Sequence, residues 1–169
     1  DGDILIVLGR GGGISDGERW AEVARSTPER QFRIIGPCTV PSSLPDNLEL
    51  RGWVDDADAQ IAAAAVVIGA AGDGVVSAVL AARRPFICLP EHRPFNEQVS
   101  KARRLAAVGG AIVRFDWPQA SDWTGLIDLA INQAEHWPVC LTDEGGAEAA
   151  ARWLHDLTAA PSSHRSRTA

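Results

Sequence analysis

The sequence predicts an α/β fold built on a doubly wound parallel sheet of about six strands. Apolar runs of strand length alternate with segments of helical period along all 169 residues, which is the pattern of βαβ units. The apolar runs are nearly continuous, as in strands buried on both faces of a parallel sheet. With 46% hydrophobic and 22% charged residues, the chain fits one ordinary domain that needs no disulfide or metal to fold.

Six apolar runs are the expected strands, at residues 3–8, 31–35, 48–51, 65–68, 85–89 and 111–114. Parallel strands of this kind most often take the Rossmann-like order 3-2-1-4-5-6, wound right-handed. The first and fourth strands are then neighbours at the switch point, where ligands bind beyond the carboxyl ends of the strands.

Helices are expected around residues 17–26, 57–63, 74–83, 97–108 and 123–134. The last of these is the clearest, because its apolar residues recur on a single face at helical spacing. They are Trp123, Leu126, Ile127, Ala130, Ile131 and Ala134. A further helix at residues 143–157 is expected to pack Ala150, Leu154 and Leu157 against the body.

The expected domain covers residues 1–158. Residues 159–169, rich in Ser and Arg, have no apolar face to bury and are expected to form a disordered tail. The sequence contains no Met, so Asp1-Gly2 is interpreted as a cut edge, with more of the protein expected upstream.

Charge and cysteine content exclude several classes of protein. There are 16 Lys and Arg against 22 Asp and Glu, a net charge of −6, which disfavours a nucleic-acid or membrane-surface partner. Cys38, Cys88 and Cys140 are far apart and odd in number, so neither a disulfide framework nor a metal site is indicated. No apolar stretch reaches the length of about 20 residues that spans a bilayer. We expect a cytoplasmic protein, with Cys88 a buried free thiol.

Both loops at the expected switch point are rich in glycine, at residues 9–15 and 69–74. Glycine allows close approach to a ligand and presents backbone amides to an anion, and each loop leads into the N-terminus of a helix, which favours phosphate. Two such loops facing one another predict a diphosphate site. The alternative is that the glycines simply turn the chain after buried strands.

The common nucleotide motifs are not met. In G-x-G-x-x-G, counted from Gly11 and Gly13, the last position is Asp16, and no acid follows the second strand at Ile35-Gly36, so NAD is disfavoured. Neither a P-loop Gly-Lys-Ser/Thr nor a G-x-S-x-G nucleophile elbow occurs.

Residues 51–113 carry a more specific pattern. It consists of Gly52-Trp53-Val54, the run from Ala65 to Gly72, Pro85, Pro90 and Phe95-Asn96-Glu97-Gln98. With the first glycine loop, this pattern resembles the C-terminal half of the GT-B glycosyltransferases, in the group of the peptidoglycan GlcNAc transferase and the macrolide and plant UDP-glycosyltransferases. The match covers most of residues 3–135.

The resemblance implies a site for a nucleotide sugar. The residues implied to border the base are Trp53 and Val54. Those implied to receive the diphosphate at a helix N-terminus are Gly72, Asp73 and Gly74. Those implied to hold sugar hydroxyls are Glu97 and Gln98, with His92 and Arg93 in the same loop. Those implied to meet the phosphate from the other side are Gly11, Gly12, Gly13 and Ser15.

Some of these residues have simpler interpretations. Trp53 stands at a strand end, where it could cap the core. His92 is otherwise an exposed loop histidine, and Glu97 begins a helix, where an acid stabilises the dipole without any ligand.

Three positions depart from the family pattern. Ala78 stands where the family has a glutamate that grips the ribose, Ala70 where a His or Arg often meets the diphosphate, and Val75 where a Ser or Thr is expected. Each hydrogen bond to a charged group contributes about 1.5–3 kcal/mol, so a weak, altered or inactive donor site is an open alternative to a functional one.

The implied function is donor binding in an inverting glycosyltransferase of hexosyltransferase type, which moves a sugar from a UDP- or TDP-sugar to an acceptor hydroxyl. The nucleotide sugar is a co-substrate, and no cofactor is implied. No catalytic residue is expected in this chain, because in the family the acceptor and the general base belong to an N-terminal domain. We expect this chain alone to be inactive.

Three alternatives remain open. The chain could be a non-catalytic or degenerate nucleotide-sugar-binding scaffold, as Ala70 and Ala78 suggest. It could also be the donor subunit of a two-subunit transferase. A nucleotide-sugar epimerase would need acid and base carboxylates in the cleft, for which Asp73 and Glu97 are the candidates.

Overall fold

The computed structural model describes residues 2–9, 11, 13–136 and 145–159. Its centre is a six-stranded, all-parallel sheet in the order β3-β2-β1-β4-β5-β6, which confirms the expected Rossmann-like fold and order. The strands are β1 (Ile4–Val7), β2 (Phe32–Ile35), β3 (Leu48–Gly52), β4 (Val66–Gly69), β5 (Phe86–Cys88) and β6 (Ile112–Val113). Ile4 pairs with Phe32 on one side and Val66 on the other, so β1 and β4 are neighbours as expected.

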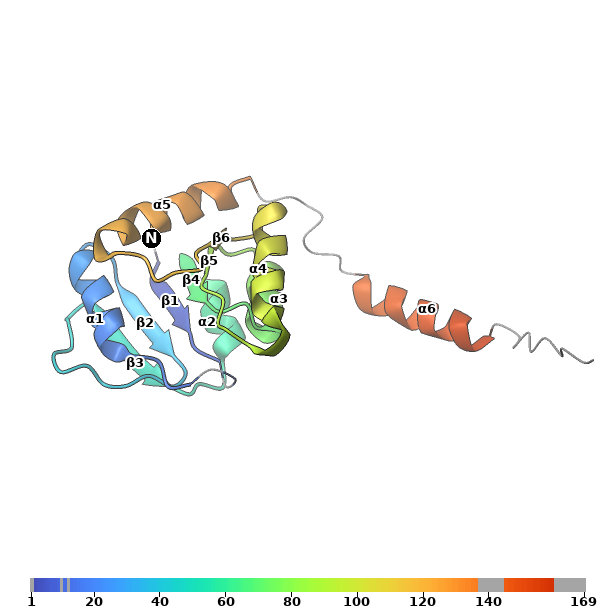
Figure 1. Ribbon diagram of the computed structural model, residues 1–169, viewed down its shortest axis with the longest axis horizontal. Helices are drawn as coiled ribbons and strands as arrows, with labels where there is room; N and C mark the ends of the chain where they lie inside the picture. The colour runs from blue at the N-terminus through green and yellow to red at the C-terminus, as the bar shows by residue number, and fades with distance from the viewer. Residues whose placement is uncertain (1, 10, 12, 137–144, 160–169) are drawn as a thin grey trace, which may run out of the picture.

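Helices cover both faces of this sheet (Figure 1). The covering helices are α1 (Gly17–Ser26), α2 (Ala57–Ala63), α3 (Asp73–Ala82), α4 (Glu97–Ala107) and α5 (Trp123–Ala134). A further helix, α6 (Gly146–Ala159), and two short 3-10 turns, η1 (Pro94–Asn96) and η2 (Ala120–Asp122), complete the described elements. The expected positions of the first five helices are confirmed.

The alternation of side chains along β1 divides the core into two layers. Ile4 and Ile6 pack on the α1 and α5 side, whereas Leu5 and Val7 pack on the side of α2, α3 and α4. Because both layers are filled, every side chain of β1 is buried, as in a sheet covered on both faces.

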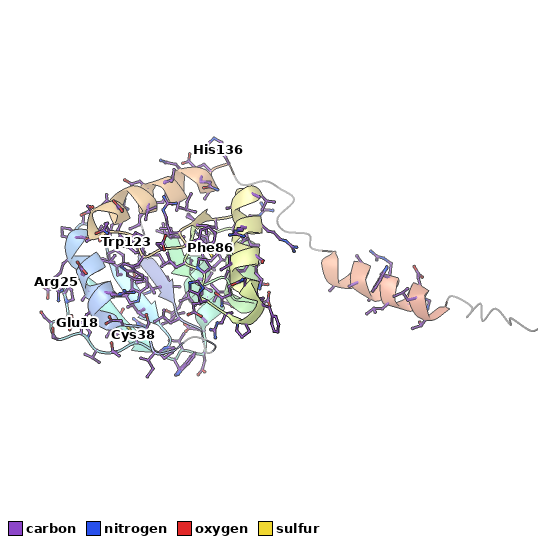
Figure 2. The ribbon with its side chains drawn as sticks, in the orientation of Figure 1. Glu18, Arg25, Cys38, Phe86, Trp123 and His136 are labelled. Carbon is purple, nitrogen blue, oxygen red and sulfur yellow. The ribbon has the colours of Figure 1, made fainter. Side chains whose placement is uncertain are left out.

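Tryptophans anchor the α1 and α5 layer. The rings of Trp20, Trp117 and Trp123 lie 4.8–5.9 Å apart between centroids, a favourable range for tilted aromatic pairs. Trp123 is fully buried and begins the apolar stripe of α5; Figure 2 labels it beneath that helix. The expected stripe is therefore confirmed as the inner face of α5.

The expectation for the last helix is wrong. The described side chains of α6, including Ala150, Leu154 and Leu157, are exposed, and Figure 1 shows this helix apart from the sheet and its covering helices. The apolar spacing of α6 correctly indicated a helix, but an amphipathic pattern does not specify which surface covers it. The expected tail at 159–169 lies outside the described residues except for Ala159, which ends α6.

Cys88 is buried in β5 and Cys38 is half-buried, and both are free thiols. Burial raises the pKa of the Cys88 thiol to about 12, so it is an inert core residue as expected. Cys140 lies outside the described residues. Within the described ranges, no helix is long and apolar enough to cross a membrane, and His, Cys, Asp and Glu form no group suited to a metal ion.

Candidate functional site

Three adjoining cavities lie at the carboxyl ends of the strands. The first, here the α2–α3 cavity, has a volume of about 340 Å³. Its described lining residues are Val7, Leu8, Gly9, Ile35, Gly36, Trp53, Val54, Ala57, Asp58, Ile61, Gly74, Val75 and Ala78. The volume is within the range of about 300–1,000 Å³ that is usual for small-molecule sites.

The second, here the glycine-loop cavity, has a volume of about 270 Å³. Its described lining residues are Gly9, Gly11, Ala70, Gly72, Gly74, Val75, Glu91, Arg93 and Gln98. It therefore lies between the loops that follow β1 and β4, and it shares Gly9, Gly74 and Val75 with the α2–α3 cavity. The two glycine loops meet at one hollow, as their place after neighbouring strands predicts.

Helix α3 opens onto this hollow. It begins at Asp73 with Gly72 as its N-cap residue, and within the described part of the chain no side chain caps its first turn. The first N–H groups of a helix lack partners inside the helix and carry a partial positive charge. The backbone N–H groups at the N-terminus of α3 can therefore donate hydrogen bonds to an anion in the glycine-loop cavity.

Arg93 supplies the positive side chain. It comes from the β5–α4 loop, its Nη2 lies 2.6 Å from Glu91 Oε2, and a Cβ placed on Gly11 would lie 3.0 Å from the same nitrogen. Arg93 therefore reaches across to the β1 loop and borders the cavity on that side. A side chain at position 11 would require the guanidinium to shift slightly, which the flexible end of Arg93 allows.

Gln98 holds two of the lining loops together. The residue is 6% exposed, and its Oε1 accepts hydrogen bonds from the backbone N–H of Ala71 at 3.2 Å and of Glu91 at 2.9 Å. This oxygen is therefore occupied in joining the β4–α3 loop to the β5–α4 loop. Its Nε2, which makes no hydrogen bond to the described residues, is the group left for a ligand.

Lys101, the sole lysine of the sequence, forms ion pairs with two acids at the edge of this site. Its Nζ pairs with Asp73 Oδ1 and lies 3.4 Å from Glu97 Oε1, and the hydrogen bond to Asp73 is the main reason that the pKa of Lys101 is raised. Asp73 thus stands at the N-terminus of α3 with its charge paired. Neither Asp73 nor Glu97 lines the cavities described here.

The remaining predicted site residues lie in different surroundings. Trp53, 58% exposed, and the half-buried Val54 line the α2–α3 cavity, so Trp53 does not cap the core. Ser15 is tied into the fold instead: its Oγ accepts from Trp20 Nε1 at 3.0 Å, and its backbone pairs beside Cys38. Gly13 and His92 are exposed and line none of the three cavities. Gly12 lies outside the described residues.

The third, here the tryptophan cavity, was missed by sequence reasoning. It has a volume of about 240 Å³ on the α1 and α5 side of the strand ends, and it shares Ala70 and Glu91 with the glycine-loop cavity. Its charged and aromatic lining residues include Arg19, Trp20, Arg114 and Trp117. They come from α1 and from the segment after β6, where no motif marks them. The sequence also gave no signal for Asp58 beyond its place in α2.

Comparison with known proteins agrees with this architecture. No family model and no curated protein matches the sequence, but solved structures match. The glycotransferase of kitacinnamycin aligns with 91% of the chain, with a TM-score of 0.72 and 20% identity. MurG of Acinetobacter baumannii aligns with 91%, with a TM-score of 0.62 and 18% identity. The spinosyn rhamnosyltransferase SpnG, solved with thymidine diphosphate, aligns with 94%, with a TM-score of 0.55 and 23% identity.

The chain spans less than half the length of these proteins, namely 43%, 49% and 42%. At identities of 18–23% the likeness concerns the fold. The order of the six parallel strands, the helices on both faces and the matched length agree with the resemblance read from the sequence. The chain therefore has the Rossmann-like fold of one half of a GT-B glycosyltransferase, and it fits the C-terminal domain of that group.

Proposed function

We propose that this chain binds the nucleoside-diphosphate sugar of a glycosyltransferase that transfers the sugar to an acceptor hydroxyl. The observation that carries the proposal is the glycine-loop cavity, where two glycine loops, the uncapped start of α3 and Arg93 surround one hollow. This is a suitable environment for a diphosphate. The thymidine diphosphate in the SpnG structure supports the proposal by analogy of fold.

The nucleoside is assigned to the α2–α3 cavity. This cavity adjoins the glycine-loop cavity, with which it shares the lining residues Gly9, Gly74 and Val75, and we assign one ligand to the two. The exposed ring of Trp53 at its rim offers a flat apolar surface to a base, and such stacking is independent of base identity. The sugar then extends from the diphosphate toward Ala70 and Glu91, where the tryptophan cavity begins.

In the proposed reaction, a base removes the proton of the acceptor hydroxyl, and the resulting oxygen attacks the anomeric carbon. The bond from that carbon to the diphosphate oxygen breaks, the diphosphate leaves with the electron pair, and the anomeric configuration inverts. This chain holds the leaving group. The N–H groups at the start of α3 and the guanidinium of Arg93 stabilise the negative charge that develops there. The base and the acceptor site are assigned to another domain or to a separate subunit.

Isothermal titration with UDP, TDP, GDP and NAD tests the binding step. We expect one or more nucleoside diphosphates to bind, and NAD not to bind. Arg93→Gln is expected to lower the affinity about tenfold to a hundredfold, from the loss of one hydrogen bond to a charged group. Arg104→Gln makes the same charge change at an exposed position of α4 outside the three cavities and serves as the control. Equal affinity for both variants would contradict the assignment of the diphosphate to this cavity.

A non-catalytic nucleotide-sugar-binding scaffold is the second candidate. It is favoured by Ala70 and Ala78, which line the glycine-loop cavity and the α2–α3 cavity with methyl groups where a polar side chain would help to bind a ligand. For a scaffold, Ala78→Glu in the full-length protein raises donor affinity but produces neither sugar transfer nor donor hydrolysis. Transfer by the full-length wild type would exclude it.

A further inference from the structure

The α2–α3 cavity contains a charged group that the proposed function leaves without a role. The cavity is bordered mainly by apolar side chains and glycine backbone. Among its described lining residues, Asp58 is the one with an ionisable side chain. It comes from the first turn of α2, and it lines the same hollow as Ala78 of α3, which offers no polar atom.

Asp58 has no partner among the described residues, because no hydrogen bond or ion pair joins its exposed carboxylate to any of them. The nearby acids either have a partner or do not line the cavity. Asp56 accepts a hydrogen bond from Gln60 Nε2 at 2.8 Å, and Asp73 is paired with Lys101. Asp55 is exposed but does not line the cavity. Asp58 thus combines an unpaired carboxylate with a position on the cavity wall.

An ionised carboxylate only accepts hydrogen bonds, so its ligand must bring donors to that wall and must keep negative charge away from it. A nucleoside diphosphate meets both conditions if its diphosphate lies in the glycine-loop cavity beside Arg93. The part of the molecule that then remains in the α2–α3 cavity includes the ribose, whose vicinal hydroxyls are the donors that a carboxylate binds in other nucleotide sites.

We propose that Asp58 accepts hydrogen bonds from the ribose hydroxyls of the bound nucleotide, and that the site thereby selects a ribonucleoside diphosphate over its 2′-deoxy counterpart. This inference rests on the proposed function, because it assumes that a nucleotide occupies the two cavities. It adds a specificity-determining residue on α2, and it narrows the donor to the ribonucleotide class.

The test is a cycle that changes the residue and the ligand separately. UDP and GDP, each with its 2′-deoxy analogue, are titrated into the wild type, Asp58→Asn and Asp58→Ala. In the wild type we expect the ribonucleotide to bind at least about tenfold more tightly than the deoxy form, because the deoxy form lacks one hydrogen bond to a charged group. In both Asp58 variants the ratio of the two affinities should fall to about one. Asp55→Asn removes the same charge from the segment just before α2, outside the cavity lining, and should leave the ratio unchanged.

The ratio separates ligand contact from structural support. Asp58 also lies in the first turn of a helix, where a carboxylate stabilises the helix dipole, but loss of that stability would weaken both ligands alike. A ratio near one in the wild type, or a ratio that survives in Asp58→Asn and Asp58→Ala, would overturn the role of Asp58 while the donor site stands. Failure of UDP and GDP and of their deoxy forms to bind would overturn the role of Asp58, and failure of TDP as well would overturn both proposals.

Discussion

Replacing Gln98 by leucine removes the acceptor that joins two loops of the donor site. In the wild type, Oε1 of this buried residue accepts from the N–H groups of Ala71 and Glu91. A buried donor that loses its partner costs about 1–3 kcal/mol, and the N–H of Glu91, which is half-buried, recovers part of its loss from water. We therefore expect Gln98→Leu to lower the free energy of unfolding by about 2–4 kcal/mol. For a domain of this size that corresponds to roughly 5–15 °C in Tm.

Thermal and urea unfolding measure this change. Gln31→Leu, at an exposed position before β2, is the control and should stay within about 0.5 kcal/mol of the wild type. Gln98→Glu keeps the acceptor oxygens and should lose less stability than Gln98→Leu. If Gln98→Leu unfolds at the temperature of the wild type, the oxygen does not hold the loops together, and the reasoning that joins them through Gln98 is refuted.

Three further experiments have definite expected outcomes. Gly36→Ala should cost more than about 2 kcal/mol in urea unfolding, because Gly36 has a φ of +98° and a Cβ would lie 2.0 Å from the carbonyl oxygen of Leu8; Gly125→Ala, where a Cβ meets nothing within 4 Å, should be neutral or stabilising. Alkylation at pH 8, followed by mass spectrometry, should leave Cys88 unmodified in the folded protein, since burial raises the pKa of its thiol to about 12; rapid modification would contradict that burial. Trp53→Ala should leave Tm nearly unchanged, because the ring is exposed, but should weaken nucleotide binding by about tenfold or more in titration; unchanged affinity would exclude stacking on this ring.

The sheet and five helices could be predicted because their signals are local. The near-continuous apolar run of β1 indicates a strand buried on both faces, and the helical spacing of the stripe beginning at Trp123 indicates a helix with one buried face. Strand order followed from the rules for parallel sheets, which also placed the two glycine loops side by side. The prediction that the apolar face of α6 packs against the body was wrong, because periodicity shows that a face is apolar without showing what covers it.

The detailed roles of side chains could not be predicted, since they depend on partners distant in sequence. Lys101 donates to Asp73, which lies 28 positions away in the sequence. The side-chain Oε1 of Gln98 accepts from the N–H of Ala71, which lies 27 positions away. Ser15 lies in a glycine loop, yet its hydroxyl accepts from Trp20 within the fold. Asp58 had no motif to mark it, and its place on the wall of a cavity emerges once α2 packs beside α3.

Backbone amide chemical shifts during titration with UDP, TDP and GDP test directly where the diphosphate binds. We expect a bound nucleoside diphosphate to shift the amides of Gly11, Gly72 and Gly74 and the indole N–H of Trp53, while the amides in the middle of α5 stay in place. Uridine, which lacks phosphate, should shift the signals of Trp53 and Gly74, which line the α2–α3 cavity, without moving Gly11 and Gly72. Shifts confined to other parts of the chain, or no shifts with any of these diphosphates, would contradict the assignment of this site to a nucleotide donor.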